Sequence, residues 1–585
     1  MRVADYIADT LVKRGIRHVF SVTGGASMHL NDALGNHPDL EVIYCHHEQA
    51  CAMAAESYAR LSGRIAAVCV TAGPGATNAI TGVFGAYTDS VPMLVLSGQV
   101  KRATLKQPGI RQLGDQEIDI VQMVKGITKF ARTILDPEDI ADDLSRALEQ
   151  ATQRRPGPAW LDIPIDIQAA EIEIDPCSLT NWQELYPIAS GPLREMYARL
   201  SKAKRPVILA GGGIRASGSH DLFLQFIDKL QIPVTTGWNA HDVIWNDHPL
   251  YVGRPGTVGD RAGNFAVQSS DFLLVLGSRL NIRQISYNWE AFAPNAYKVM
   301  VDVDPGELQK PTLKIDLPIH ADLKDFFPLA LDMGYKPRPK HQEYLGWCKE
   351  RQRKYPVVLP EYRNTEKGIN PYYFMECLFK HLREDDVVVC ADGTACVTAF
   401  QAAYLKRGQR LYTNSGCAAM GYELPAAIGA CFARNRKRVI CIAGDGSIQM
   451  NIQELATIAH HNLPIKIFVL NNGGYHSIRQ TQQNFFPGRI VGCGSESGLN
   501  VSRVLEVAEG YGFCTNWMDK NVPGNLDDIL RDSIPELCEV SLDRSQSFSP
   551  KLMSYRDPSG AMVTPPLDDM SPLLSREELA GNRLG

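Results

Sequence analysis

The sequence of 585 residues contains no C-x-x-C pair, although it has 14 cysteines. So many cysteines could suggest disulfides, but the absence of such a pair argues against them. Several cysteines instead stand inside apolar runs that are typical of strands, among them Cys69, Cys390 and Cys441. We therefore expect buried free thiols in a reducing cytoplasm rather than disulfides.

The sequence also lacks the apolar run of about 18 residues that a membrane-spanning helix requires. Its start, MRVADYIADTLVKRGIRHVF, mixes apolar and charged residues at helical spacing and has no continuous apolar core of a signal peptide. Lysine and arginine together number 60 against 65 acidic residues, a formal charge of −5 that argues against a general polyanion binder. These features predict a cytoplasmic protein that binds neither membranes nor nucleic acid.

Short runs of valine, isoleucine and alanine, bounded by glycine, alternate along the chain with amphipathic segments of helix length. This rhythm is typical of parallel sheets with crossover helices. Two stretches rich in proline and charge, 174–192 and 336–371, interrupt it and are interpreted as linkers. The fold class is predicted to be α/β, with three doubly wound parallel-sheet domains.

The outer thirds of the sequence resemble each other. RIAAVCVTAGPGATNAITG and RVICIAGDGSIQMNIQELA share a basic start, an apolar strand, an A-G-x-G turn and a helix, and their turns lie 371 residues apart (Gly73 and Gly444). Generic βα units could match by chance, but duplication explains the similarity better. The middle third opens with RPVILAGGGIRASG, whose glycines permit either a phosphate contact or only a tight turn.

Two polar motifs follow neighbouring predicted strands of the last third. Asp445 stands between two glycines after one strand, and Asn471 and Asn472 end the next, with 24 residues between the motifs (447–470). Carboxyl ends of parallel strands meet at one edge of a sheet, where α/β proteins bind ligands. Either motif alone would be a helix cap or a turn. Together they predict a magnesium ion that holds a diphosphate.

This pair of motifs resembles the diphosphate-binding motif of the thiamine-diphosphate enzymes. The resemblance implies thiamine diphosphate as cofactor and Mg²⁺ bound by Asp445, Asn472 and the main-chain carbonyl of Gly474. HHEQACAMAAESYARLSG matches the segment of the family that supplies a catalytic glutamate, here Glu48. Its carboxyl group would share a proton with the aminopyrimidine ring and so favour the imino form. Without the surrounding match, Glu48 would be an ordinary acid at a helix start.

Longer stretches, including 71–100, 125–131, 416–430 and 444–467, resemble the acetolactate synthase branch. In that branch Met420 would lie under the bent cofactor, and main-chain groups of Ala418 and Met420 would hold the pyrimidine; core packing is the alternative for Met420. The remaining cofactor-binding positions that the resemblance implies are Thr394, Gly444, Gly446, Ser447 and Tyr475. FAD, in a structural role, is implied for the central domain at Gly211, Gly212, Gly213, Arg279, Asp302 and Asp322.

The match fails around the second substrate. Gln116 matches a glutamine near the reacting carbon, but Asp115 replaces a phenylalanine, Thr481 a tryptophan and Arg254 a methionine. A pocket with more polar walls suits a larger, oxygen-rich or phosphorylated acceptor. Arg279, which meets the carboxylate of the acceptor in acetolactate synthases, is retained and favours a 2-oxo acid.

The tail SPKLMSYRDPSGAMVTPPLDDMSPLLSREE resembles a subgroup that adds a two-carbon unit from pyruvate to the ketone of a nucleotide-activated deoxysugar. A lid over the active site is the alternative interpretation. We expect a pyrimidine-binding domain over 1–175, a central Rossmann-like domain over 190–335, a diphosphate-binding domain over 365–548 and a tail over 549–585.

The resulting hypothesis is a transferase that decarboxylates pyruvate and joins the two-carbon unit to a carbonyl acceptor. The resemblance implies a homodimer or homotetramer with active sites between chains. A flavin-linked pyruvate oxidase is the first alternative, and a non-catalytic relative kept for assembly is the second. The acceptor, flavin occupancy, the number of chains and a regulatory subunit are left open.

Overall fold

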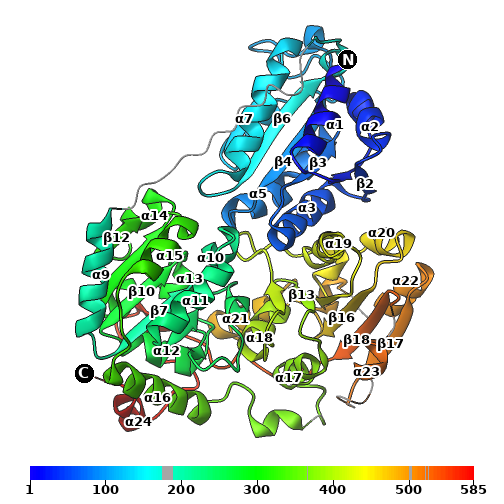
Figure 1. Ribbon diagram of the computed structural model, residues 1–585. Coiled ribbons are helices and arrows are strands. Elements are labelled where there is room, and N and C mark those ends of the chain that lie inside the picture. Colours follow the sequence, from blue (N-terminus) through cyan, green and yellow to red (C-terminus); the bar gives the residue numbers. More distant parts are fainter. Residues whose placement is uncertain are drawn as a thin grey trace.

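The structure is a computed structural model that describes residues 1–173, 189–364, 366–499, 503–520, 522, 524, 526–531 and 533–584. These residues form three six-stranded sheets, parallel throughout, with helices on their faces (Figure 1). The predicted α/β fold with three parallel-sheet domains is confirmed. Most of the first predicted linker, residues 174–188, lies outside the described residues.

The first sheet has the strand order β2-β1-β3-β4-β6-β5. Its strands are β1 (His18–Ser21), β2 (Glu41–Tyr44), β3 (Ala66–Val70), β4 (Met93–Gln99), β5 (Phe130–Thr133) and β6 (Pro158–Pro164). The helices of this part are α1 (Val3–Lys13), α2 (Met28–Gly35), α3 (Glu48–Ser62), α4 (Pro74–Asn78), α5 (Ile80–Thr88), α6 (Ile120–Val124), α7 (Ile140–Thr152) and α8 (Ile165–Ala169). Strands β3, β4 and β6 are buried along their whole length, as in sheets covered on both faces.

The central sheet has the order β12-β11-β10-β7-β8-β9, the doubly wound order of dinucleotide-binding folds. Its strands are β7 (Pro206–Ala210), β8 (Val234–Thr236), β9 (Tyr251–Gly253), β10 (Phe272–Leu276), β11 (Tyr297–Asp302) and β12 (Leu317–His320). The helices are α9 (Ser190–Lys202), α10 (Gly213–Ala216), α11 (His220–Leu230), α12 (Arg261–Gln268), α13 (Ile282–Ile285), α14 (Pro305–Gln309), α15 (Leu323–Asp332) and α16 (Pro339–Lys354).

The third sheet has the order β14-β13-β15-β16-β18-β17. Its strands are β13 (Val387–Cys390), β14 (Arg410–Tyr412), β15 (Val439–Gly444), β16 (Ile465–Asn471), β17 (Cys514–Met518) and β18 (Glu536–Ser541). The helices are α17 (Pro371–His381), α18 (Thr394–Ala402), α19 (Glu423–Ala433), α20 (Glu454–His460), α21 (His476–Phe485), α22 (Val504–Gly510) and α23 (Leu526–Ile529). Counted from its own first strand, this order is the same as that of the first sheet, which supports the duplication.

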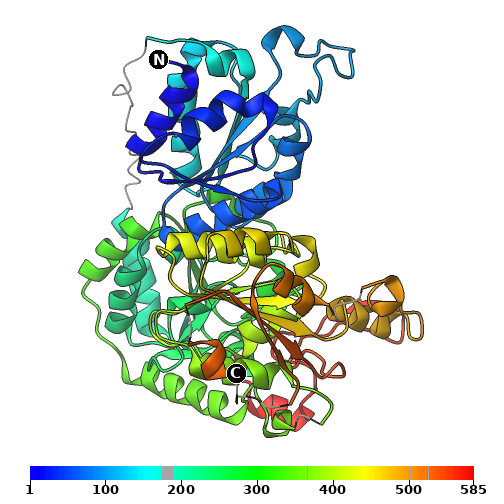
Figure 2. The ribbon, with the colours of Figure 1, turned by 90° about the vertical axis from the view of Figure 1, so that its right-hand side faces the viewer.

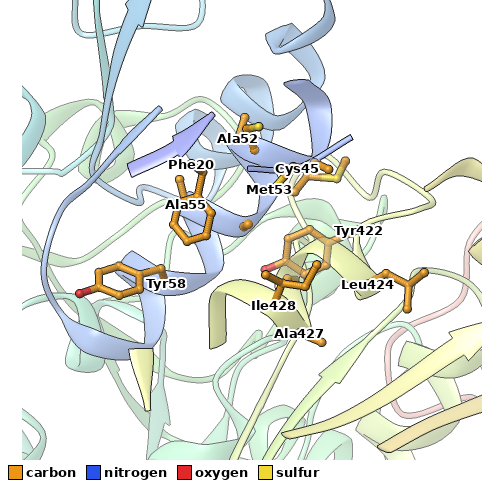
Figure 3. Packing of buried hydrophobic residues seen from close by; sticks show 14 of the residues in the cluster. Phe20, Cys45, Ala52, Met53, Ala55, Tyr58, Tyr422, Leu424, Ala427 and Ile428 are labelled. Atoms are coloured by element: carbon orange, nitrogen blue, oxygen red, sulfur yellow. The ribbon is translucent and has the colours of Figure 1, made fainter. Parts of the chain in front are cut away.

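Helices α3 and α19 pack against each other where the first domain stands on the third (Figures 1 and 2). Both are rich in alanine, and a Cβ on Gly429 would lie 1.9 Å from the carbonyl oxygen of Ala54, so the helices cross in close contact. Figure 3 shows Met53 and Tyr58 on one side of this buried cluster and Tyr422 and Ile428 on the other. The similar small-residue helices of the two copies therefore form one shared core.

The second predicted linker is not a plain connection. It contains α16, which packs against α12 and β9 of the central domain. Tyr344 and Cys348, one helical turn apart, are buried with Val252 and Ala266, and the Tyr344 hydroxyl donates to the Ala266 carbonyl. This apolar stripe is short and lies among charged residues, so the sequence pattern did not predict the helix.

The tail lies on the central domain. Leu552 and Leu567 are buried beside residues of β7 and β10, and the Asn264 amide donates to the Leu567 carbonyl at 2.9 Å. The tail contains β19 (Tyr555–Arg556), β20 (Met562–Val563) and α24 (Arg576–Gly581). Its role as a lid stays a prediction, as do the predicted domain boundaries. In the described part of the chain, no helix is both long and apolar enough to cross a membrane.

Candidate functional site

The ends of β15 and β16 bring the two predicted metal motifs together. The strands are parallel neighbours, with Gly444 beside Leu470, so the residues that follow them share one edge. The Asp445 carboxylate accepts hydrogen bonds from the main-chain N–H groups of Gly446 at 2.7 Å, Asn472 at 3.1 Å and Gly474 at 2.8 Å. Burial raises the pKa of Asp445, and these backbone donors oppose the rise.

Asn472 offers a free oxygen at the same place. Its side-chain nitrogen donates to the Thr394 hydroxyl at 3.1 Å, which fixes the orientation of the amide. Its oxygen Oδ1 is buried and has no hydrogen-bond partner among the residues that the structure describes. A buried acceptor without a partner costs about 1–3 kcal/mol, so a ligand for it is expected. An amide oxygen beside a carboxylate is a donor set that fits Mg²⁺.

Glycine is required at two positions of this turn. Gly474 has φ +118°, and a Cβ there would lie 2.2 Å from the carbonyl oxygen of Cys493. A Cβ on Gly446 would lie 2.3 Å from the Tyr475 ring, which shows that Tyr475 packs directly on the turn. At Gly444 the nearest atom would be 3.5 Å away, so space alone does not demand glycine there.

The segment predicted to hold the pyrimidine precedes α19. Ala418 is exposed with φ +56°, and Met420 is half-buried. The Ser447 hydroxyl, predicted to face the cofactor, accepts from the Gly421 N–H at 2.8 Å and donates to the Glu423 carboxylate at 2.9 Å. Ser447 thus connects this segment to the Asp445 turn.

Glu48 and Gln116 lie around one turn of the first domain. Glu48 begins α3 and is half-buried, and its Oε2 accepts from the Asn78 amide at 3.0 Å. A Cβ on Gly75 would lie 3.3 Å from Glu48 Oε1, and one on Gly73 would lie 2.6 Å from the Gln116 carbonyl oxygen. The structure therefore places both predicted catalytic residues beside the A-G-P-G turn.

Residues next to Glu48 contact the domain that carries the Asp445 turn. The Asn451 amide, four residues after Ser447, donates to the Gln49 side chain at 3.2 Å and to the Gly421 carbonyl at 2.7 Å. The start of α3 therefore lies beside the segment that carries Met420.

The structure does not bring together the three residues that were predicted to line the pocket for the acceptor substrate. Asp115 is exposed near Gln116, and Thr481 is exposed on α21, where its hydroxyl donates to the Ser477 carbonyl at 3.0 Å. Arg254 is only 2% exposed, and its guanidinium donates to the main-chain carbonyls of Phe400 at 2.8 Å and Ala403 at 2.6 Å.

The position of Arg254 does not favour its predicted role. Carbonyls at the end of a helix have no partners within the helix, and a guanidinium satisfies them well. Arg254 therefore joins the central domain to the end of α18. The two guanidinium nitrogens that donate to these carbonyls are not free to bind a substrate. Of the residues predicted to make the acceptor pocket more polar, Asp115 and Thr481 thus remain.

A cavity of about 700 Å³ lies between the three domains. Its walls include every position predicted for FAD, namely Gly211, Gly212, Gly213, Arg279, Asp302 and Asp322. Cβ atoms on Gly211 and Gly213 would lie 2.2 and 2.8 Å from the backbone of Gly277, so these two glycines also serve a close turn. Burial raises the pKa of Asp302 to about 6.

Sequence reasoning missed two charged residues near this edge. Asp392 follows β13, as Asp445 follows β15, and accepts from the Thr413 hydroxyl at 3.2 Å; burial raises its pKa to about 8. Arg283, which opposes that rise, stacks 4.8 Å from the centre of the Trp238 ring. The signal for Asp392 was present, because it is another aspartate before a glycine at the end of an apolar strand.

Three family models match the chain, and each covers most of one sheet. They describe the N-terminal thiamine pyrophosphate binding domain of thiamine pyrophosphate enzymes over residues 1–123, the central domain over 193–329 and the C-terminal thiamine pyrophosphate binding domain over 392–540. Together with the relatives that follow, they show that the chain belongs to the thiamine pyrophosphate enzymes.

The curated relatives narrow this class. The chain is 34% identical to an acetolactate synthase large subunit of Lactococcus lactis over 93% of both chains. It is 32% identical to the large subunit of acetolactate synthase isozyme 2 of Escherichia coli, over 98% of this chain and all of the relative. It is 35% identical to the chloroplastic acetolactate synthase 1 of Zea mays, over 94% and 87%. The protein is an acetolactate-synthase-like, thiamine-pyrophosphate-dependent enzyme, in agreement with the carboligase class predicted from its motifs.

Proposed function

We propose that the protein takes a two-carbon unit from pyruvate, with loss of carbon dioxide, and adds it to a carbonyl acceptor. The acceptor is either a second 2-oxo acid or the keto group of a nucleotide-activated deoxysugar. The observation that carries the proposal is the buried, unpartnered oxygen of Asn472 beside Asp445. It supports a magnesium ion at the edge where the family binds its diphosphate.

Asp445, Asn472 and the Gly474 carbonyl would hold Mg²⁺, with Thr394 orienting the Asn472 amide. Thiamine diphosphate, when bound, supplies the nucleophilic carbon and accepts the electrons left by decarboxylation. The chain would orient the cofactor, because main-chain groups of Ala418 and Met420 would bind its pyrimidine ring.

Glu48 is proposed to hold a proton against the aminopyrimidine ring. Its Oε2 is held by Asn78, and Gly75 leaves room beside its Oε1. The carboxyl group is therefore held in a defined orientation at the start of α3. Glu48→Gln should retain cofactor binding and lose most turnover; full activity of this variant would contradict the assignment.

FAD is proposed for the 700 Å³ cavity, in a structural role. A flavin-linked pyruvate oxidase would use the same cavity for a flavin that accepts electrons, so the two functions differ in one measurement. With pyruvate alone, an oxidase bleaches the flavin absorption and then forms hydrogen peroxide or a reduced acceptor. The carboligase leaves the flavin oxidised during turnover.

The proposed assembly is a homodimer or homotetramer in the cytoplasm. Glu48 and Asp445 come from different domains, which lie side by side within the single chain. The resemblance to the family implies instead that the first domain of one chain completes its site with the third domain of another. Mixing inactive Glu48→Gln and Asp445→Ala chains tests this arrangement. Sites between chains restore activity in the mixed dimer, whereas sites within one chain do not.

The acceptor is tested by product analysis. The purified protein is incubated with thiamine diphosphate, Mg²⁺, FAD and pyruvate, with and without a nucleotide-linked 4-keto-deoxysugar, and products are identified by mass spectrometry. A sugar heavier by C2H4O, that is, by an acetyl group on the former ketone carbon and a hydrogen on its oxygen, with little acetolactate, supports the sugar ketone. Fast acetolactate formation that the sugar does not affect supports a second pyruvate. Absence of any pyruvate-derived product would refute the proposed function.

A further inference from the structure

A buried hydrogen-bond chain links the two segments that the proposed function assigns to the two ends of the cofactor. The Gly421 N–H donates to Ser447 Oγ, and the Ser447 hydroxyl donates to Glu423 Oε2. Gly421 directly follows Met420, and Ser447 comes two residues after Asp445. Ser447 is 3% exposed and the Glu423 side chain is fully buried, so water does not compete for these bonds.

Glu423 is unusual for an acid at a helix start. It is the first residue of α19, where a carboxylate is favoured by the helix dipole, but such residues normally remain in water. Here the neighbours Tyr422 and Leu424 belong to the buried cluster shared with α3 (Figure 3). Within the described part of the chain, Glu423 Oε1 has no hydrogen-bond partner. Burial raises the pKa of Glu423 to about 7. Burial of an acid costs free energy of folding. Its presence here therefore indicates a role other than stabilising the helix.

The other side of the same segment is also anchored. The Gly416 N–H donates to Asp89 Oδ1 at 2.9 Å, and Asp89 pairs with Arg60 on α3 at 2.8 Å. The Tyr422 hydroxyl donates to Glu56, one turn before Arg60. Residues 416–422 are therefore held at the first domain through Asp89 and at the Asp445 turn through Ser447.

We propose that Glu423 is a positioning residue that acts through Ser447. By fixing Ser447, it sets the separation between the segment that holds the pyrimidine, at Met420, and the turn that holds the diphosphate, at Asp445. The inference rests on the proposed function and goes beyond it, because Ser447 was expected to bind the cofactor itself. A displacement of about 1 Å in such a geometry can lower turnover about 100-fold.

The test compares Glu423→Ala, Ser447→Ala, the double variant and Glu423→Gln in the full-length protein. Glu423→Ala and Ser447→Ala should each lower kcat about 10–100-fold, with a change in the Kd of thiamine diphosphate of less than about threefold, because Asp445 and Asn472 remain. The double variant should be no worse than either single variant, since both remove the same link. Glu423→Gln keeps an acceptor for the Ser447 hydroxyl and should restore most of the lost turnover.

Two readouts separate positioning from a structural role. The circular dichroism of the bound cofactor, which reports its environment and conformation, should change in both alanine variants. Asp221→Asn, which removes an almost fully exposed acid from the first turn of α11, serves as the control and should change neither kcat nor this signal.

The outcomes are distinguishable from failure of the proposed function. If the wild-type protein forms no product from pyruvate, the proposed function fails. If the wild type turns over pyruvate but both alanine variants keep its kcat, or if Glu423→Ala only lowers the melting temperature, the positioning role is refuted. A multiplicative loss in the double variant would also contradict it, because the two residues would then act separately.

Discussion

The two adjacent asparagines after β16 should respond to substitution in opposite ways. Asn471 is engaged on both ends of its amide: the nitrogen donates to Glu539 at 2.7 Å and the oxygen accepts from the Gly473 N–H at 3.0 Å. The Asn472 side-chain nitrogen is engaged with Thr394, whereas its buried oxygen has no partner in the described ranges of the chain. We expect Asn471 to serve stability and Asn472 to serve metal binding.

The magnitudes follow from these bonds. Asn471→Ala loses one hydrogen bond to a carboxylate, about 1.5–3 kcal/mol, and one to a backbone N–H, about 0.5–1.5 kcal/mol. Its domain should be destabilised by roughly 2–4 kcal/mol, which lowers the melting temperature of the cofactor-free protein by roughly 5–10 °C. Asn472→Ala loses one hydrogen bond but also removes an unpartnered buried oxygen that costs about 1–3 kcal/mol, so the net change should be near zero.

Two assays separate the roles. Thermal unfolding without cofactor measures stability, and calorimetric titration with thiamine diphosphate at saturating Mg²⁺ measures affinity. Asn472→Ala should weaken binding at least about 100-fold, while Asn471→Ala should bind within about threefold of wild type at a temperature where it is folded. Wild-type affinity in Asn472→Ala, or equal destabilisation of the two variants, would refute the reasoning.

Gly474→Ala should weaken magnesium-dependent cofactor binding tenfold or more, because φ +118° and the Cys493 carbonyl leave no room for a Cβ; titration calorimetry measures this. Lys466→Met should destabilise the third domain by about 3–5 kcal/mol in denaturant unfolding, because Lys466 is fully buried and leaves the nearly buried Glu536 without its ion-pair partner at 2.8 Å. Asp302→Asn should stabilise the cofactor-free protein at neutral pH by up to about 3 kcal/mol, since burial raises the pKa of Asp302 from 3.8 to about 6. The folded state binds the extra proton between these values, so the advantage of the variant should grow from pH 4 to pH 6 and then stay constant.

The first two of these predictions have matched control variants, and the third has a distinct outcome that would contradict it. Gly512→Ala has φ +86° but open space around the new methyl group, so it should lower stability without changing cofactor affinity. Arg531→Gln breaks an exposed ion pair with Asp528, and more than about 1 kcal/mol of destabilisation there would undermine the comparison with Lys466. A constant stability difference between wild type and Asp302→Asn across pH 4–7 would show that Asp302 titrates normally.

The closeness of Asp445 and Asn472, on which the proposed magnesium site rests, could be predicted because it depends on local rules. An apolar run that ends at Asp445 and another that ends at Asn472 place both residues at the carboxyl ends of strands, and parallel pairing brings those ends together. The same rule would have found Asp392. Duplication, seen as two similar strand-turn-helix segments, reappears as two sheets of one strand order.

Other features could not be predicted, because the partners come from distant parts of the chain. Arg254 was predicted to line the acceptor pocket, but the end of α18, 146 residues away in sequence, supplies carbonyls for its guanidinium, a position that does not favour that role. The buried stripe of α16 became evident only where it meets β9 and α12.

The amino-acid sequence by itself thus determined the fold class, the duplicated sheets and the motifs of a thiamine pyrophosphate enzyme, because strand periodicity, glycine turns and short motif spacings act between near neighbours. Tertiary structure alone decided which side chains remain available. Asn472 keeps a free oxygen since Thr394 holds its nitrogen, whereas Ser447 is engaged with Gly421 and Glu423. Each polar side chain has a limited number of donors and acceptors, and these bond to the groups that tertiary packing brings within about 3 Å. Many of those groups come from distant parts of the sequence.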